Sequence, residues 1–508
     1  MAKSPTLPRG FNNPVRLAKD LHELPEKHWQ KRGSKMALEL FKAMSRHVPA
    51  YKDFLQKQKV DAKKIKSISD FQAVPPVDKD NYLRQYPREM LCWKGEFKPN
   101  RWVISTTSGS TGNPYYFPRQ DLQDLQYALA AELYLRTNFE IHKKSTLYIV
   151  AFPMGAWIGG VFTYEALKIL AERGNYALSI ITPGIHKAEI ISAVKELAGN
   201  FDQVIIGSYA PFLKDILDDG VKAGIDWKKL NLGFVFSAEA FSEQFRDYVI
   251  KKTGLKNEFI STLNHYGTVD LGTMSHETPL TNLIRRRIVN DEQAYEALLP
   301  NLNKLPTLTQ YIPELFYFED IEGNLLCSAY SGLPLARYDL KDRGGVVSLS
   351  DAAKRLKAAG MDIYREAKNV KIDKTIWNLP LVYVYERSDL SVSFYAFQIY
   401  PETIRRALHD ESIEDDITGK FTMQVKYDDS AQQVFEINIE LKTDRQESAK
   451  LHDHLTSLIV KSLLKESSEY RETHERYGEK IYPQLVFWPY EDTSFFRPGV
   501  KQKWVKKD

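Results

Sequence analysis

Strand-like and helix-like segments alternate between about residues 101 and 345, and no other sequence feature constrains the fold more. The apolar runs 147–152 and 232–236 are typical of buried strands. Between such runs, residues 121–137 and 187–198 place their apolar side chains on one helical face. This alternation predicts a large α/β domain with mixed or parallel sheets. Ligands of such sheets bind at the carboxyl ends of the strands, so we expect functional residues in the loops that follow.

The pattern changes after about Tyr385. Residues 421–427 and 434–441 alternate apolar and polar side chains on either side of a polar turn, which predicts an antiparallel hairpin with one buried face. A helix and a further strand follow. We therefore predict a large N-terminal domain over residues 1–386 and a small α+β C-terminal domain over residues 387–508.

Composition favours a soluble cytoplasmic protein. The chain has 508 residues, and 70 Lys and Arg against 66 Asp and Glu leave a net charge of only +4, which gives no indication of nucleic-acid binding. The two cysteines, Cys92 and Cys327, lie far apart in sequence and cannot form a disulfide framework or a four-cysteine zinc site, which favours a reducing compartment. Residues 145–164 carry no charge, but Pro153 and three glycines favour a buried strand that enters a loop over a membrane span. No interface signal decides whether the chain forms a homodimer.

A Ser/Thr-rich loop begins at Ser105, directly after a strand-like run. Glycines in such a loop allow backbone conformations that turn amide N–H groups toward one point, and the hydroxyls add further donors. This arrangement suits a triphosphate, although no Walker motif follows. An ordinary surface loop is the alternative. The predicted phosphate-binding residues are Thr107, Ser108, Gly109, Ser110, Thr111 and Gly112.

The loop resembles the signature of adenylate-forming enzymes, which include acyl-CoA synthetases and peptide-synthetase adenylation domains. More narrowly, the chain from about Arg46 onward resembles the phenylacetate–CoA ligase branch, whose opening segment is similar to residues 46–87. The resemblance implies the adenylate-forming enzyme fold and the use of ATP and Mg²⁺ to activate a carboxylic acid.

Two further segments resemble the family's adenine-binding motifs. Ser237, Ala238 and Glu239 follow a strand and resemble the Gly-Ala-Glu segment that lines the adenine pocket, with Ser in place of the Gly. A helix N-cap is the alternative for these three residues. In the segment HYGTVD, the resemblance implies that Tyr266 stacks on adenine, with Gly267 beside it. A buried tyrosine in a turn is the alternative there.

The same resemblance implies three polar roles. Asp270 replaces the family's glutamate as the Mg²⁺ ligand, which a hard cation tolerates. Asp342 accepts hydrogen bonds from the ribose hydroxyls, unless it forms an ion pair with a neighbouring arginine. Arg387 lies near ribose or phosphate, and Asp389 is the hinge between the domains.

The C-terminal segment RPGVKQKW resembles the segment that carries the family's catalytic lysine. The best register gives this role to Lys501, with Lys503 as the rival and a solvated basic tail as the alternative. Ala396 replaces a glycine beside the family's thiol-acceptor tunnel, which makes CoA less certain than ATP.

The acid pocket is predicted from the loops after the strands. Its walls are mostly apolar or aromatic, which suits an aryl or medium acyl group, and the glycine pair leaves room for it. Core packing is the alternative for each aromatic residue. The predicted walls are Trp157, Gly159, Gly160, Ser208, Tyr209 and His265.

These features predict an enzyme that converts a carboxylic acid to an acyl-adenylate with release of pyrophosphate and then forms a thioester with CoA. An alternative acceptor is an amine, a carrier protein or a protein cysteine. A non-catalytic nucleotide-binding protein is the alternative from another class, because Asn113 and Tyr115 stand where the family often has a lysine.

Overall fold

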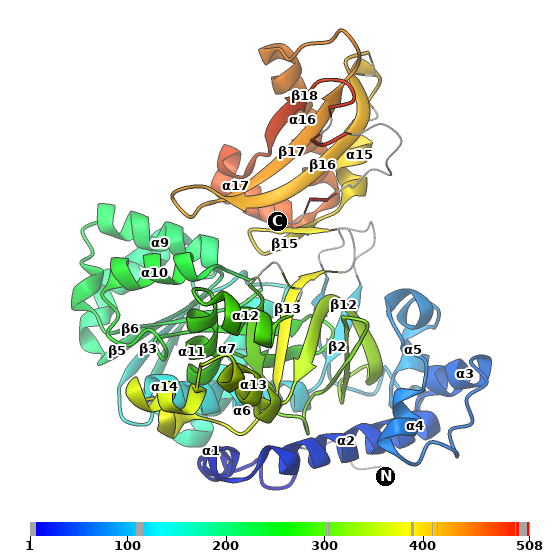
Figure 1. The fold of residues 1–508 in the computed structure, drawn as a ribbon, viewed down its shortest axis with the longest axis vertical. Helices are drawn as coiled ribbons and strands as arrows, with labels where there is room; N and C mark the ends of the chain where they lie inside the picture. The colour runs from blue at the N-terminus through cyan, green and yellow to red at the C-terminus, as the bar shows by residue number, and fades with distance from the viewer. Residues whose placement is uncertain are drawn as a thin grey trace. The chain divides into compact units, whose positions relative to one another are not determined.

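The computed structural model describes residues 7–506, apart from 108–114, 239, 301, 303–304, 388–390, 409, 414, 493 and 497–504. The side chains of residues 211, 386, 387, 402 and 411 are also outside the description. The chain divides into two compact units (Figure 1). Unit 1 comprises Met1–Ser105 and Phe117–Ser388, and unit 2 comprises Thr106–Tyr116 and Asp389–Asp508.

Unit 1 is built on a mixed sheet that has 11 strands among the described residues, in the order β10-β11-β12-β13-β9-β8-β7-β6-β5-β3-β4. The half from β4 to β7 is parallel, and the half from β7 to β10 is antiparallel. The parallel strands are β3 (Thr146–Ala151), β4 (Leu178–Ile181), β5 (Gln203–Ser208), β6 (Leu232–Phe236) and β7 (Thr262–Thr268). The antiparallel strands are β8 (Gly272–His276), β9 (Thr307–Gln310), β10 (Tyr317–Ile321), β11 (Asn324–Ala329), β12 (Leu335–Val347) and β13 (Leu381–Arg387).

Helices cover the parallel half, whose central strands are buried along their whole length. Every residue of β3, β5 and β6 is buried, as expected for parallel strands between two helical layers. One core cluster joins Tyr127 and Tyr134 of α6 to Phe162 of α7 and to Tyr148 and Val150 of β3. The helices of this half are α6 (Asp121–Phe139), α7 (Ile158–Gly174), α8 (Lys187–Leu197), α9 (Ala210–Lys222) and α10 (Glu243–Thr253).

The antiparallel half packs against two further groups of helices. The long helix α2 contacts β10, β11 and β12, and a second core cluster lies among α11 to α14. Gly33 of α2 is required there, because a Cβ atom would lie 2.5 Å from Cβ of Pro313. The N-terminal helices are α1 (Pro14–Glu23), α2 (Glu26–His47), α3 (Pro49–Lys57), α4 (Ile68–Gln72) and α5 (Arg88–Leu91). The others are α11 (Pro279–Ile288), α12 (Glu292–Leu298), α13 (Leu349–Ala358) and α14 (Ile363–Asn369).

Unit 2 contains the predicted hairpin. It consists of β16 (Ile417–Tyr427) and β17 (Gln433–Leu441), and β18 (Gln484–Trp488) adds a parallel strand beside β17. A small hairpin of β14 (Val392–Phe394) and β15 (Phe397–Ile399) precedes them. The helices of this unit are α15 (Pro401–Leu408), α16 (Ala449–Glu466) and α17 (Ser468–Tyr477).

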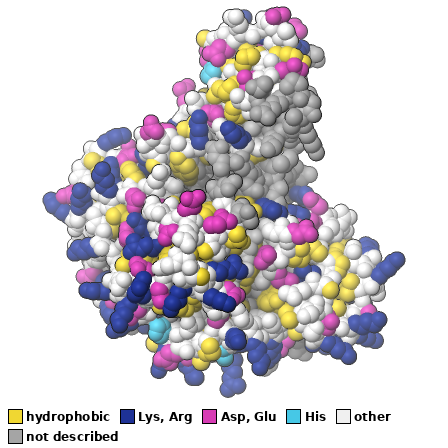
Figure 2. Space-filling view, viewed as in Figure 1, with side chains coloured by type: hydrophobic (Ala, Val, Ile, Leu, Met, Phe, Trp, Pro, Cys, Tyr) yellow, Lys and Arg dark blue, Asp and Glu magenta, His cyan; other side chains and the backbone are white. Residues whose placement is uncertain are grey.

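The uncharged stretch of residues 145–164 divides into β3, a loop and the first turns of α7. Within the described part of the chain, no helix is long and apolar enough to cross a membrane. On the face shown in Figure 2, lysine and arginine side chains are scattered among acidic and polar ones.

Candidate active site

Tyr266 and Asp342, the two residues predicted to bind adenosine, lie against each other. The Tyr266 hydroxyl donates a hydrogen bond of 2.7 Å to Oδ2 of Asp342. Both side chains are buried, with 9% and 5% of their surface exposed. In the sheet order, β8, β9 and β13 lie between β7, which carries Tyr266, and β12, which carries Asp342. The sheet therefore curls enough to bring one face of β7 to β12.

Asp270 lies in the turn between β7 and β8 and points its carboxylate at the same strand, β12. Its Oδ2 accepts a hydrogen bond from the Tyr338 hydroxyl and lies 3.4 Å from Nζ of Lys79. Mg²⁺ in nucleotide sites takes one or two carboxylates, with phosphate oxygens and water completing its coordination. A single buried carboxylate therefore fits the predicted role, and the described residues contain no group of three metal-ligating side chains.

Lys79 is a candidate site residue that the sequence analysis missed. A short parallel bridge holds its segment to β12: the Val77 amide donates to the Arg337 carbonyl (3.1 Å), and the Asp339 amide donates to the Val77 carbonyl (2.8 Å). Lys79 then opens a single π-helical turn, Lys79–Leu83. The only signal in the sequence was its place in the opening segment that resembles the family.

The Lys79 ammonium also approaches the strand that follows the phosphate loop. Its Nζ lies 5.8 Å from the centre of the Phe117 ring, on β2 (Tyr116–Arg119). Its side chain keeps 32% of its surface exposed, so the charge is accessible to a bound anion. Lys79 thus places a cation close to both Asp270 and β2.

The phosphate loop is described only at its two ends. The Thr107 amide donates to the Tyr115 carbonyl (3.0 Å), and the Tyr115 amide donates to Oγ1 of Thr107 (2.9 Å). These bonds extend the pairing of β1 (Val103–Thr106) with β2 and close the neck of the loop. The predicted residues Ser108, Gly109, Ser110, Thr111 and Gly112 lie outside the described residues.

Ser237 and Ala238 lie at the carboxyl end of β6, as predicted. Ala238 is exposed and has a φ of +76°, a left-handed conformation that costs a non-glycine residue energy. Phe241 and Glu243 follow a few residues later, and both bind the buried Arg285 of α11. The Arg285 guanidinium donates to the Phe241 carbonyl and pairs with the Glu243 carboxylate at 2.7 Å. This anchors the segment to α11, while Glu239 lies outside the described residues.

Of the glycine pair in the predicted acid pocket, Gly160 does not leave room for a ligand as expected, whereas a Cβ atom on Gly159 would make only an ordinary contact. A Cβ atom on Gly160 would lie 2.4 Å from Sδ of Met154 and 2.5 Å from the Pro153 carbonyl oxygen. A Cβ atom on Gly159 would lie 3.4 Å from Cβ of Phe152. The absence of a side chain at Gly160 therefore allows close packing. Trp157 directly precedes α7 as its N-cap residue.

The remaining predicted pocket residues end two parallel strands. Ser208 is the last residue of β5, and its hydroxyl donates to the Tyr209 carbonyl at 3.2 Å. Tyr209 is buried and precedes α9. His265 on β7 is also buried, and burial together with the nearby His276 lowers the pKa of its imidazole well below the usual value. His265 is therefore neutral at neutral pH.

The other predicted site residues lie outside the description. These are the Arg387 side chain, the hinge residue Asp389 and the two candidate lysines Lys501 and Lys503. Their roles stay predictions.

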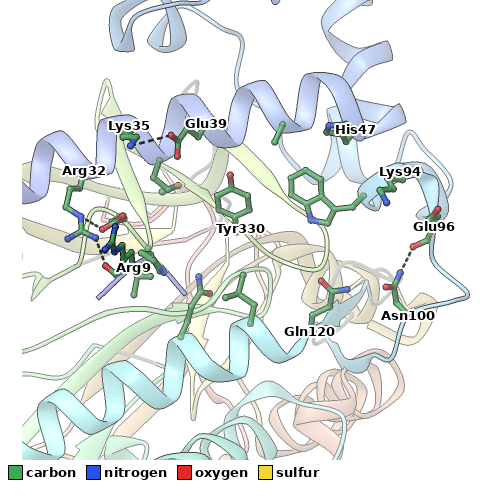
Figure 3. A pocket seen from close by; sticks show the side chains of 18 of the residues that line it. Arg9, Arg32, Lys35, Glu39, His47, Lys94, Glu96, Asn100, Gln120 and Tyr330 are labelled. Atoms are coloured by element: carbon green, nitrogen blue, oxygen red, sulfur yellow. Dashed lines mark hydrogen bonds and ion pairs between the residues drawn. The ribbon is translucent and has the colours of Figure 1, made fainter. Parts of the chain in front are cut away.

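A pocket of about 590 Å³ lies in a different part of unit 1, between α2 and the start of α6 (Figure 3). Trp93 and Tyr330 stack in its wall with ring centres 5.9 Å apart. Its charged side chains are of both signs, and Lys35 pairs with Glu39 at 3.7 Å. None of the predicted site residues lines this pocket, so it is separate from the candidate active site.

Solved structures with the same fold include 2-hydroxyisobutyryl-CoA ligase in three states. The first is the complex with 2-HIB-AMP and CoA in the thioesterification state, which is 14% identical to this chain and has a TM-score of 0.66. The match covers 96% of this chain and 92% of the ligase. The postadenylation state with R3-HIB-AMP (14% identity, 96% and 92% coverage) has a TM-score of 0.54. An open conformation with 2-HIB-AMP and CoA (13% identity, 96% and 94% coverage) has a TM-score of 0.53.

No protein-family model matches the sequence, and the comparison with curated proteins gives no match. The structural likeness extends over nearly the whole chain and confirms the predicted adenylate-forming enzyme fold. The phenylacetate–CoA ligase branch stays a prediction.

Proposed function

We propose that this protein is an ATP-dependent acid–thiol ligase. It activates a carboxylic acid as an acyl-adenylate, releases pyrophosphate and transfers the acyl group to CoA. The observation that carries the proposal is the contact between Tyr266 and Asp342, two residues singled out for the two halves of adenosine. Their proximity supports a nucleotide site at the carboxyl end of β7, where an α/β sheet binds its ligands.

In this proposal the Tyr266 ring stacks on adenine and the Asp342 carboxylate binds the ribose. A carboxylate has about four acceptor positions, so Asp342 can accept from Tyr266 and still accept from two ribose hydroxyls. The hydrogen bond from Tyr266 also fixes the orientation of the carboxylate before ATP binds. The Asp342 side chain therefore loses less conformational entropy when ATP binds.

Asp270 would hold Mg²⁺ on the phosphates, with Tyr338 and Lys79 fixing its orientation. A bound Mg²⁺ would neutralise charge on the triphosphate and on the departing pyrophosphate. Lys79 adds a second positive charge nearby, in place of the lysine that the phosphate loop lacks. This cation weakens the case for a non-catalytic nucleotide binder.

The chemistry then follows from position and charge. A carboxylate oxygen of the acid attacks the α-phosphorus, forms the new P–O bond and displaces pyrophosphate. Lys501 would stabilise the charge that develops on the α-phosphate. The CoA thiol, losing its proton, then attacks the acyl carbon and displaces AMP. The resemblance implies that residues 387–508 rotate about Asp389 between the two steps.

The β14–β15 hairpin supports CoA as the acceptor. Its turn residues Tyr395 and Ala396 have φ values of +45° and +67°. Ala396 thus keeps the left-handed backbone that a glycine adopts easily, and the shape of the turn does not depend on glycine. The substitution that made CoA less certain leaves this turn intact. Cys92 and Cys327 are free and buried, which is consistent with the proposed cytoplasmic location.

ATP–pyrophosphate exchange without CoA, over a panel of aryl and aliphatic acids, tests the first step. Exchange that depends on one acid class establishes adenylation, and AMP release that then rises with CoA establishes the ligase. AMP release stimulated by an amine or a carrier protein would point to the alternative acceptor. ATP binding without exchange for any acid would refute the proposal in favour of a nucleotide-binding protein.

A further inference from the structure

Three buried polar atoms in one cluster beside the predicted acid pocket have no hydrogen-bond partner among the described residues. They are Nε2 of His265 and the hydroxyl oxygens of Tyr148 and Tyr134, and the three side chains have only 4%, 0% and 1% of their surface exposed. Buried polar groups in folded proteins almost always have a partner, because an unpaired one costs about 1–3 kcal/mol. Three such groups in one cluster therefore indicate a partner that the described residues do not supply.

The Tyr148 and His265 atoms belong to the face of the sheet that α6 covers. The Tyr148 hydroxyl extends along the sheet until it lies over Gly207, where a Cβ atom would be 2.7 Å from the oxygen. Gly207 directly precedes Ser208 of the pocket wall. On β7, the His265 ring lies 5.8 Å from the Tyr127 ring and 5.1 Å from the Tyr134 ring, measured between centres.

His265, Tyr148 and the adjoining Tyr127 are all uncharged at neutral pH. Burial and His276 lower the pKa of His265, while burial raises the pKa of Tyr148 well above that of a free phenol. The nearby Tyr127 hydroxyl is engaged with Oγ1 of Thr163 at 3.2 Å. A charged group brought against these side chains would lose its hydration without gaining an opposite charge from them, whereas an uncharged hydroxyl or carbonyl would gain hydrogen bonds.

We propose that the acid activated by this protein carries an uncharged oxygen function, a hydroxyl or a keto group, at the end away from its carboxylate. Tyr148 and His265 bind that oxygen. The inference rests on the proposed function and narrows its substrate class from aryl or medium acyl acids to hydroxyaryl, hydroxyacyl or oxoacyl acids. The same reasoning disfavours dicarboxylic and amino acids, because neither Tyr148 nor His265 supplies a charge for their second ionised group.

Matched pairs of acids that differ by a terminal hydroxyl in place of a methyl group test this. Suitable pairs are para-hydroxybenzoate with para-methylbenzoate, para-hydroxyphenylacetate with para-methylphenylacetate, and an omega-hydroxy fatty acid with its methyl-ended isostere. Two readouts are measured: kcat/KM for the acid in pyrophosphate exchange, and the rise in Tm on adding the acid alone. We expect at least one pair in which the hydroxy acid is preferred about tenfold or more.

The variants assign the preference to the two residues. Tyr148→Phe removes a single oxygen that has no partner among the described residues, so it leaves the packing in place. In this variant the ratio of kcat/KM for the hydroxy acid to kcat/KM for its methyl partner should fall toward one. His265→Phe should have the same effect. Tyr51→Phe is the matched control, because Tyr51 on α3 also has a buried hydroxyl without a partner among the described residues. That variant should keep the wild-type preference.

The outcomes separate this inference from the proposed function. Exchange without preference for any hydroxy acid, or a preference that Tyr148→Phe and His265→Phe leave unchanged, overturns the inference and leaves adenylation standing. A Tm preference that Tyr148→Phe abolishes, without exchange for any acid, supports the pocket and refutes the enzyme. Neither exchange nor a Tm preference overturns both.

Discussion

The Tyr266 hydroxyl donates a hydrogen bond of 2.7 Å to Asp342, a residue 76 positions further along the chain. One strand on the parallel half of the sheet and one on the antiparallel half thereby supply adjoining parts of the proposed nucleotide site. Close by on β12, Tyr338 reaches Asp270 in the same way. Two tyrosine–aspartate pairs thus link β12 with β7 and the turn that follows it.

Tyr266→Phe should weaken ATP binding while it preserves stacking on adenine. The variant loses the donor that orients Asp342, so we expect the KM for ATP in pyrophosphate exchange to rise roughly three- to tenfold. Tyr311→Phe is the control, because the Tyr311 ring packs on the same Phe318 as the Tyr266 ring does. An unchanged KM for ATP in Tyr266→Phe would show that this hydrogen bond does not contribute to ATP binding.

Asp270→Asn and Lys79→Met should change different parameters. Loss of the Asp270 charge should raise the Mg²⁺ concentration for half-maximal exchange about tenfold or more, because a neutral amide is a weaker ligand for a hard cation.

Loss of the Lys79 charge should lower kcat about tenfold or more at saturating Mg²⁺. Lys57→Met, on the exposed side of α3, is the surface control. If Lys79→Met retains its full kcat, the lysine has only a structural role.

Lys501→Ala should reduce acyl-adenylate formation by roughly 10²–10³ or more, because one electrostatic contact to the transition state is lost. Thioester formation from chemically prepared acyl-adenylate and CoA should continue, because the resemblance implies that another face of the small domain serves that step. Lys503→Ala provides the comparison. Normal exchange in Lys501→Ala together with its loss in Lys503→Ala would transfer the role to Lys503.

Ala396→Gly should stabilise unit 2. An alanine at a φ of +67° carries steric strain of roughly 1–2 kcal/mol that glycine avoids, although glycine loses about 0.4–1 kcal/mol through the greater entropy of its unfolded chain. The expected net effect is a small rise in the Tm of unit 2, with the CoA-dependent rate unchanged. A fall in Tm would show that the alanine side chain makes a stabilising contact that outweighs the strain.

Stability should decrease as the pH falls below about 6.5. Burial lowers the pKa of His276 to about 4 in the folded protein, while an unfolded histidine titrates near 6.5. Between these values the unfolded chain binds more protons than the folded one, so protonation favours unfolding. Each such histidine lowers the free energy of unfolding by up to about 1.4 kcal/mol per pH unit. Urea unfolding at pH 7, 6 and 5 measures the slope.

His276→Gln is the test variant for this pH dependence. The neutral glutamine does not titrate, so the slope should become shallower and the remaining dependence should come from His265 and other groups. Equal slopes in the two proteins would show that His276 is protonated in the folded state.

Segments buried on both faces were the most predictable from sequence. Strand β6 occupies residues 232–236 as predicted, and the helix predicted at 121–137 extends to Phe139. Both depend on patterns within a few turns of chain, which a sequence displays directly. The prediction for Gly160 was wrong, because a glycine in a sequence does not show whether its missing side chain leaves space or admits a neighbour. Here Met154 and the Pro153 carbonyl occupy that position.

The sequence by itself determined which segments form strands and helices and which residue types could bind a nucleotide, since these follow from local periodicity and side-chain chemistry. Only the tertiary structure decided that Lys79 lies beside Asp270 and that Tyr148 and His265 share one buried face. Those relationships join residues from separate strands and loops. They depend on the order and curvature of the strands in the sheet, which no local pattern encodes.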